Sequence, residues 1–160
     1  MNGEDMNELL DYRERLMSRL GAAADEFRAA CLAVINPYAS LEEGGWNTHQ
    51  VAVHTRDVDK LVYGLRARRT AAEENPEFQN FDGDNYMAEH YDPNESLREL
   101  LNGFVESVEA LVEMLKALPI EAWSRESRHA TLGKGFALQT WVDRDLAHIE
   151  EHLETVKKGK

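Results

Sequence analysis

The sequence predicts an all-α protein, a four-helix bundle with a long crossover between its second and third helices. Apolar residues recur every three or four positions over four long stretches, whereas strand-like alternation of apolar and polar residues is nearly absent. The chain has 160 residues, of which 42% are hydrophobic, and this suits one domain around a single core. We expect that domain to span 1–157, with a disordered tail at 158–160.

The first two helices are predicted over about 5–34 and 47–70. Pro37 ends the first, because the residue before a proline avoids helical geometry. Asn47 is a good N-cap for the second, and Gln50, three residues later, can complete a capping box. These boundaries leave a short loop between the two helices.

The other two helices are predicted over about 92–118 and 136–156. Asp92 as N-cap, Pro93 at the first helical position and Glu95 closing the box mark the start of the third helix. Its apolar stripe is dense in leucine and valine. The fourth helix follows a glycine-containing connection.

Two connections join these helices. Residues 74–91 contain Pro76, Gly83 and many Asp and Asn, so we expect a long crossover loop. Loops of that length in a compact domain are often functional. Residues 123–135 form the second connection.

Composition narrows the range of partners. The chain has 18 Lys and Arg against 30 Asp and Glu, a net charge of −12, which disfavours binding to nucleic acids and anionic membranes. The single cysteine, Cys31, cannot form an intramolecular disulfide and is expected to be a core residue. No signal peptide and no membrane-spanning run of about 20 apolar residues is apparent. We therefore expect a cytoplasmic protein that acts on a small-molecule substrate.

Three histidines are candidates for a shared metal site. His148 and His152 are four residues apart, so both imidazoles lie on one face of the fourth helix and can bind one ion. His54 lies on the apolar stripe of the second helix. The spacing leaves two alternatives open, a shared metal or two histidines that fall four residues apart by chance. The remaining histidines, His49, His90 and His129, are predicted to be surface or loop residues.

Several motifs resemble the DinB-like superfamily. The segment 46–57, WNTHQVAVHTRD, looks like the start of that family's second helix, where a Trp opens the helix and a His eight residues later is the first metal ligand. The segments 123–125 and 131–133 resemble its connection before the last helix. His148 and His152 resemble its paired ligands. The similarity extends over nearly the whole chain.

The resemblance implies a bundle that runs up, down, down and up, often as a homodimer, with a divalent metal held by three histidines. Carried over to this sequence, the ligands are His54, His148 and His152. The superfamily includes mycothiol-dependent maleylpyruvate isomerase and bacillithiol transferases. It therefore implies an external low-molecular-weight thiol as a possible cosubstrate.

Three imidazole ligands leave at least one coordination position open, as in catalytic zinc sites. Imidazole suits several divalent metals, of which we expect Zn or Ni. Asp57 and Asp145 each lie one turn from a proposed ligand, so either can orient an imidazole or act as a general base. The alternative for both is an ordinary helix-surface carboxylate.

Three functions follow from these observations. The first is a metal-dependent, thiol-dependent S-transferase or isomerase. The second is a metal-dependent hydrolase using the same ion. The third is a non-enzymatic, stress-associated metal-binding protein, and the sequence alone does not separate the three.

Overall fold

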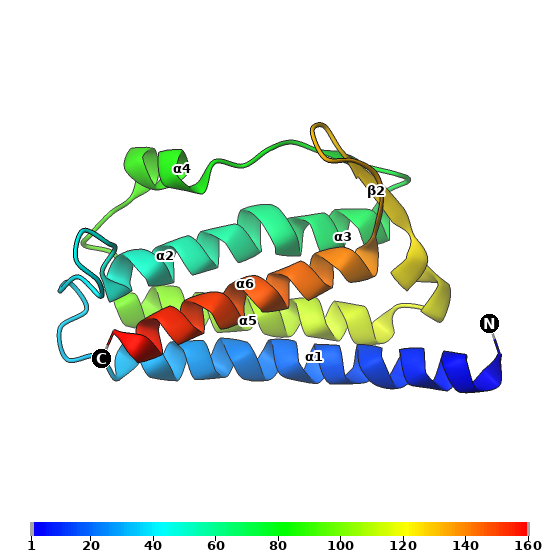
Figure 1. Cartoon of the computed structure of the whole chain (residues 1–160), viewed down its shortest axis with the longest axis horizontal. Coiled ribbons are helices and arrows are strands. Elements are labelled where there is room, and N and C mark those ends of the chain that lie inside the picture. The colour runs from blue at the N-terminus through cyan, green and yellow to red at the C-terminus, as the bar shows by residue number, and fades with distance from the viewer. Residues whose placement is uncertain (1, 160) are drawn as a thin grey trace.

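The computed structural model describes residues 2–159 and confirms the predicted four-helix bundle (Figure 1). The second of the four long helices is built from two α-helical parts joined by a π-helical turn. The long helices have these bounds: α1 Gly3–Leu32, then α2 Thr48–Val58 with η1 Asp59–Tyr63 and α3 Gly64–Ala72, then α5 Leu97–Ala117 and α6 Leu138–Lys158.

The helices run up, down, down and up. α1 and α6 run in one direction, and α2, α3 and α5 run in the other (Figure 1). α1 packs against α5 and α6, and α2 and α3 pack against the same two helices. Because the second and third long helices are parallel, residues 73–96 must return along the length of the bundle between them (Figure 1).

Aromatic side chains fill the core between the helices. Phe27 of α1 meets Phe104 of α5 edge to face, with ring centres 5.7 Å apart. Trp141 of α6 is fully buried, and its indole N–H donates to the hydroxyl of Ser127 at 2.7 Å. A buried indole N–H needs an acceptor, so this bond ties α6 to the connection that precedes it.

The π-helical turn η1 changes which residues of the second long helix share a face. In a straight α-helix, residues four apart drift around the axis by about 40° per step. The wider turn, in which the Gly64 N–H bonds the Asp59 carbonyl, removes part of that drift. His54, Val62 and Arg66 consequently line one cavity, although they lie eight and four residues apart.

Both connections contain regular structure, which corrects their prediction as loops. The crossover holds strand β1 (Glu77–Phe78) and helix α4 (Gly83–His90), and the second connection holds the 3₁₀ turn η2 (Ile120–Ser124) and strands β2 (Glu126–His129) and β3 (Gly133–Ala137). β2 pairs parallel with β1 and antiparallel with β3. Strands of two to five residues are too short to produce a periodic pattern.

The third long helix begins later than predicted. Its N-cap is Ser96, whose hydroxyl accepts the Glu99 N–H at 3.3 Å. Asp92 instead opens a turn, in which its carboxylate accepts the Asn94 N–H at 2.9 Å. Turns and helix starts both favour aspartate followed by proline, so this motif does not distinguish them, and the predicted start at Asp92 is wrong.

The fourth long helix reaches Lys158, one residue into the tail expected at 158–160. Gly159 follows in a turn and lies against the side chain of Leu41, where a Cβ would be within 2.5 Å of Leu41 Cδ2. Lys160 lies outside the described residues. Within residues 2–159, no helix is both long and apolar enough to cross a bilayer.

The π-helical turn predicts a stability difference between two glycines. A Cβ at Gly64 would overlap the Asp59 carbonyl oxygen, whereas one at Gly103 of α5 would meet nothing within 4 Å. We expect Gly64→Ala to lower the free energy of unfolding by about 1–3 kcal/mol. Gly103→Ala should raise it by about 0.5–1 kcal/mol, since alanine favours helix. Urea denaturation measures both, and equal effects would contradict the close approach at Gly64.

Candidate metal centre

Three imidazoles from two helices converge on one point. His54 comes from α2, and His148 and His152 come from successive turns of α6. The Nε2 atom of His148 lies 3.2 Å from that of His54 and 3.0 Å from that of His152. One nitrogen from each of the three residues lies within 4.8 Å of the other two. The structure therefore brings together all three predicted ligands.

These separations fit a tetrahedral ion. Two Zn–N bonds of about 2.0–2.1 Å at the tetrahedral angle place the nitrogens about 3.3 Å apart, close to the 3.0 and 3.2 Å observed. In a ring coordinated through Nε2, the hydrogen lies on Nδ1, so three lone pairs can face one ion. The donor set suits a divalent metal that accepts imidazole ligands.

The environment keeps the three rings neutral. Burial and the neighbouring His152 lower the pKa of His54 to about 4. Burial and the two other imidazoles lower the pKa of His148 to about 3. Burial also lowers the pKa of His152. Metal ligation needs the unprotonated nitrogen, which is therefore present near neutral pH.

Aromatic residues and the crossover surround the cluster. The Trp46 ring centre lies 5.0 Å from that of His54, and the Tyr63 ring centre lies 5.8 Å from that of His148. Gly83, the first residue of α4, packs so closely that a Cβ there would be 3.0 Å from His54 Cε1. The crossover thus covers one side of the cluster, at a position where only glycine fits without a shift.

A cavity of about 290 Å³ opens beside His54 and His148. Its walls come from the second long helix, the crossover, the β2–β3 hairpin and α6. The lining residues are His54, Val58, Val62, Tyr63, Arg66, Asn80, Phe81, Gly83, His129, Leu132, Arg144 and His148. Two of the three candidate ligands, His54 and His148, therefore face a space that can hold a small molecule.

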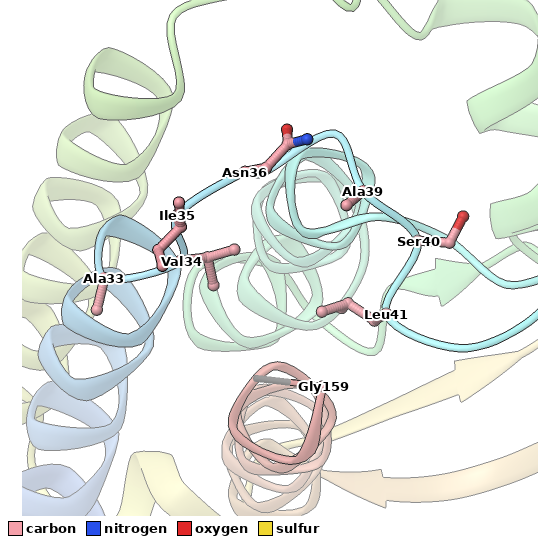
Figure 2. A pocket seen from close by; sticks show the side chains of 8 residues that line it. All are labelled: Ala33, Val34, Ile35, Asn36, Ala39, Ser40, Leu41 and Gly159. Atoms are coloured by element: carbon pink, nitrogen blue, oxygen red, sulfur yellow. The ribbon is translucent and has the colours of Figure 1, made fainter.

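A second hollow lies at the end of α1 and has a different character (Figure 2). It is lined by Ala33, Val34, Ile35, Asn36, Ala39, Ser40, Leu41 and Gly159. None of these side chains is charged or a metal ligand. Chemistry is consequently to be sought at the histidine cavity and not here.

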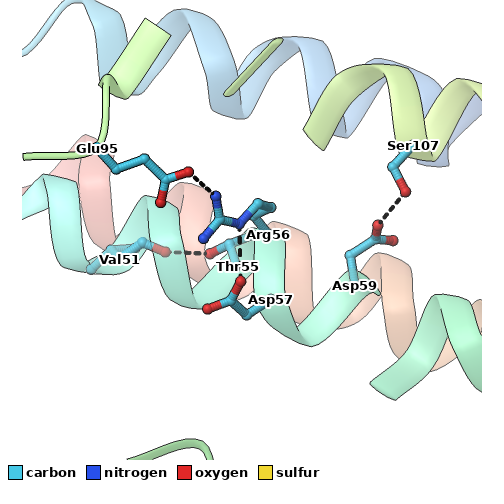
Figure 3. A network of polar contacts seen from close by, with 7 residues as sticks. All are labelled: Val51, Thr55, Arg56, Asp57, Asp59, Glu95 and Ser107. Atoms are coloured by element: carbon cyan, nitrogen blue, oxygen red, sulfur yellow. Dashed lines mark hydrogen bonds and ion pairs between the residues drawn. The ribbon is translucent and has the colours of Figure 1, made fainter. Parts of the chain in front are cut away.

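Asp57, one of the two predicted catalytic carboxylates, is held by arginine. Its carboxylate accepts a hydrogen bond from Arg56 Nε at 2.9 Å, and the same guanidinium pairs with Glu95 (Figure 3). Burial raises the pKa of Asp57, and Arg56 partly opposes that rise. The charge of Asp57 favours the protonated form of His54, so it acts on that ring from a distance.

Asp145, the other predicted carboxylate, is fully buried and paired with Asp59. Ser107 on α5 donates to Asp59 at 3.3 Å (Figure 3). Burial and the neighbouring Asp59 raise the pKa of Asp145 well above its usual value, because a dry environment and a like charge both disfavour the ionised carboxyl group. Within residues 2–159, no hydrogen bond joins Asp57 or Asp145 to a ligand ring. Their predicted catalytic roles stay predictions.

Two of the three remaining histidines differ from their predicted surface placement. His49 is fully buried, because its ring accepts the Tyr91 O–H at 2.6 Å and donates to the Glu95 carbonyl at 2.7 Å. His129 lies in β2, is 5% exposed and lines the cavity. His90 is exposed, as predicted, and stacks on Tyr86 at the end of α4.

The structure adds cavity residues that sequence reasoning missed. Arg66 and Arg144 both line the cavity. Arg144 lies one turn before His148, which the helical period could have shown. Arg66 lies twelve residues after His54, and in a straight helix that spacing would place it about 120° away. Only the π-helical turn brings it to the same face.

The fold and the site together define a class, a bundle of up-down-down-up topology with three imidazoles gathered at a cavity. Among solved structures, YfiT from Bacillus subtilis is similar, with a TM-score of 0.82 and 17% sequence identity over 92% of this chain and 85% of that one. YfiT is described as a probable metal-dependent hydrolase with an unusual four-helix bundle topology. The likeness confirms the predicted fold. No protein-family model and no curated protein matches the sequence.

Replacing His49 and replacing His90 should change the stability of the protein to very different extents. His49→Ala leaves the part-buried Tyr91 hydroxyl and Glu95 carbonyl without their partner and a cavity in place of a fully buried ring, so we expect the free energy of unfolding to fall by about 2–3 kcal/mol. His90→Ala on the surface should change it by less than about 0.5 kcal/mol. Neither should reduce zinc content, as elemental analysis can show. Loss of zinc in a folded His49→Ala protein would contradict a purely structural role.

The lowered histidine pKa values predict acid sensitivity of the metal-free protein. The unfolded chain binds protons at histidine near pH 6.5, whereas folded His54 and His148 bind them only near pH 4 and 3. The contribution of these two rings to the free energy of unfolding is thus fully present above about pH 6.5. It falls as the pH drops below that value, by up to about 1.4 kcal/mol per pH unit for each ring. Urea titration of chelator-treated protein measures this slope. His148→Asn should make it shallower, and an unchanged slope would contradict the prediction.

Proposed function

We propose that this protein is a divalent-metal-dependent hydrolase whose ion is held by His54, His148 and His152. The observation that carries the proposal is the convergence of three Nε2 atoms, of which those of His54 and His148 belong to residues that line a cavity. The description of the similar YfiT structure as a probable metal-dependent hydrolase supports it. Of the two expected metals, we propose Zn²⁺, which accepts three imidazole ligands and keeps a fourth position open for substrate or water.

A bound divalent ion would supply Lewis acidity, which polarises an ester, amide or phosphoester and activates water near neutral pH. The protein's part is to hold three neutral rings in place by burial. Because all three ligands are uncharged, they leave the full charge of the ion uncompensated. Because His54 and His148 line the cavity, a substrate can approach from that side.

Asp57 is the better candidate for an auxiliary role in this reaction. Its carboxylate is half-buried, and its charge acts on His54. Asp145 faces Asp59, and burial together with that carboxyl group raises its pKa, which disfavours its charged form. We propose that the charge of Asp57 raises the pKa of His54 and so makes that ring a stronger metal ligand. Asp145 instead supports the packing of α6 against the π-helical turn.

Thiol transfer is a second candidate, supported by the sequence resemblance to the DinB-like superfamily. An all-imidazole site suits a thiolate, because a metal ion deprotonates a coordinated thiol. Cys31 is buried in the core, so the thiol would be an external small molecule. The resemblance also implies a homodimer, for which light scattering is the direct measurement.

The function predicts linked losses of metal and activity. We expect the protein purified without a tag to carry about one Zn²⁺ per chain. His148→Ala should lose that zinc and lower hydrolysis of a responsive ester, amide or phosphoester by at least about 100-fold. His90→Ala is the matched control and should retain both. The same proteins are also assayed with small thiols and electrophiles, so that thiol transfer is tested beside hydrolysis.

The outcomes separate the three functions. Turnover only with thiols would replace hydrolysis by transfer. Zinc bound at full occupancy with no turnover of any substrate would point to a non-enzymatic metal-binding protein. Substoichiometric metal in both the wild type and His148→Ala would reject the site itself.

A further inference from the structure

We propose that the cavity beside the three histidines binds an oxyanion, a carboxylate or phosphate of a small-molecule substrate, on Arg66, Arg144 and His129. The inference rests on the proposed function, since it names the class of substrate that the same cavity would take. In this proposal His54 and His148 form the metal side of the cavity, and Arg66, Arg144 and His129 form a cationic wall.

Arg66 supplies the most constrained charge of this wall. It is 7% exposed, and its Nη2 donates to the Gln79 carbonyl at 2.9 Å. Its guanidinium carbon lies 4.8 Å from the ring centre of Trp141. Within residues 2–159, no carboxylate forms an ion pair with it. A buried guanidinium with N–H groups to spare and no counter-ion is suited to a planar oxyanion.

Arg144 places a second guanidinium on the same indole. Its guanidinium carbon lies 5.4 Å from the ring centre of Trp141 and 5.4 Å from that of Phe136. The side chain is exposed, and among the described residues it too has no carboxylate partner. Two positive groups gathered on one aromatic ring repel each other unless an anion lies between them.

His129 adds a neutral donor. Its Nδ1 accepts the backbone N–H groups of Thr131 and Leu132, each at 3.1 Å. A neutral ring that accepts at Nδ1 carries its hydrogen on Nε2. Burial and the two arginines lower the pKa of His129, which favours the neutral ring. All three side chains line the same cavity.

The charge of the cavity is opposite to that of the protein. The chain carries 30 acidic against 18 basic residues. None of the twelve residues that line the cavity is acidic, and two are arginines. Arg144 also contributes to lowering the pKa of Arg66. In a protein of net charge −12, a cavity with unneutralised arginines attracts the anions that the rest of the surface repels.

The arrangement orients a substrate. His54 and His148 line the same cavity as the two arginines, so a molecule anchored by its oxyanion can present a second functional group to the metal side. Fixing the molecule at a distance from the reacting bond supplies the orientation that catalysis needs. Neutral analogues lacking the oxyanion would lose this anchor.

Anion binding to the metal-free protein tests the inference independently of hydrolysis. Isothermal titration at low ionic strength compares glutarate, inorganic phosphate and uncharged dimethyl glutarate. We expect at least one of the anions, but not the diester, to bind chelator-treated wild type. Arg144→Gln should weaken that binding about tenfold while zinc content stays unchanged. Arg66→Lys, which keeps the charge but removes the planar fork, should weaken it further.

Arg19→Gln is the matched control, because it removes the same charge from an exposed site on α1 where Arg19 pairs with Glu26 and Glu150. It should leave anion binding unchanged. Equal weakening by Arg19→Gln and Arg144→Gln, or no binding of either anion, would overturn the cationic wall. Anion binding that requires Zn²⁺ and is unchanged by Arg144→Gln would place the anion on the metal, and this result would also overturn the cationic wall. Failure of hydrolysis with Arg144-dependent binding intact would reject the proposed function alone.

Discussion

The packing of α2 against α6 is the constraint on which the site depends. It sets His148 Nε2 3.2 Å from His54 Nε2, whereas the helical spacing within α6 sets it 3.0 Å from His152 Nε2. The packing also buries all three rings far enough to hold them neutral. Imidazoles at such separations, buried without a shared ion, leave ring nitrogens poorly satisfied, and the Nδ1 of His148 already lacks a partner among the described residues. The bundle therefore gathers three potential metal ligands, but it leaves ring nitrogens among them without good hydrogen bonds.

The irregular parts of the fold gather around this contact. The crossover lays Gly83 on His54, and Asn80 of the crossover donates to Thr131 of the hairpin at 2.6 Å. The parallel pairing of β1 with β2 joins the same two segments. The regular helices thus position the candidate ligands. The two connections bind each other and form the cavity wall that faces those ligands.

The four helices and the paired spacing of His148 and His152 could be predicted, because amphipathic periods and His–His spacing are local properties of the sequence. The up-down-down-up topology and the full ligand set were instead implied by the resemblance to the DinB-like superfamily. The strands and α4 could not be predicted, since they are too short to carry a period. His49 was assigned to the surface because its partners, Tyr91 and the Glu95 carbonyl, lie more than forty residues away along the chain. Arg66 was missed for a different reason: its place at the cavity depends on a backbone irregularity and not on spacing.

That irregularity also bears on how the chain can vary in length. A π-helical turn such as η1 is equivalent to one residue inserted into an α-helix. Deleting one residue within Asp59–Tyr63 would restore a regular helix in which Arg66 follows His54 by eleven positions, about 20° around the axis. Both residues would then stay on the cavity side. Related chains that keep both ends of the cavity are therefore expected to have either this helix with its π-helical turn or a regular helix that is one residue shorter.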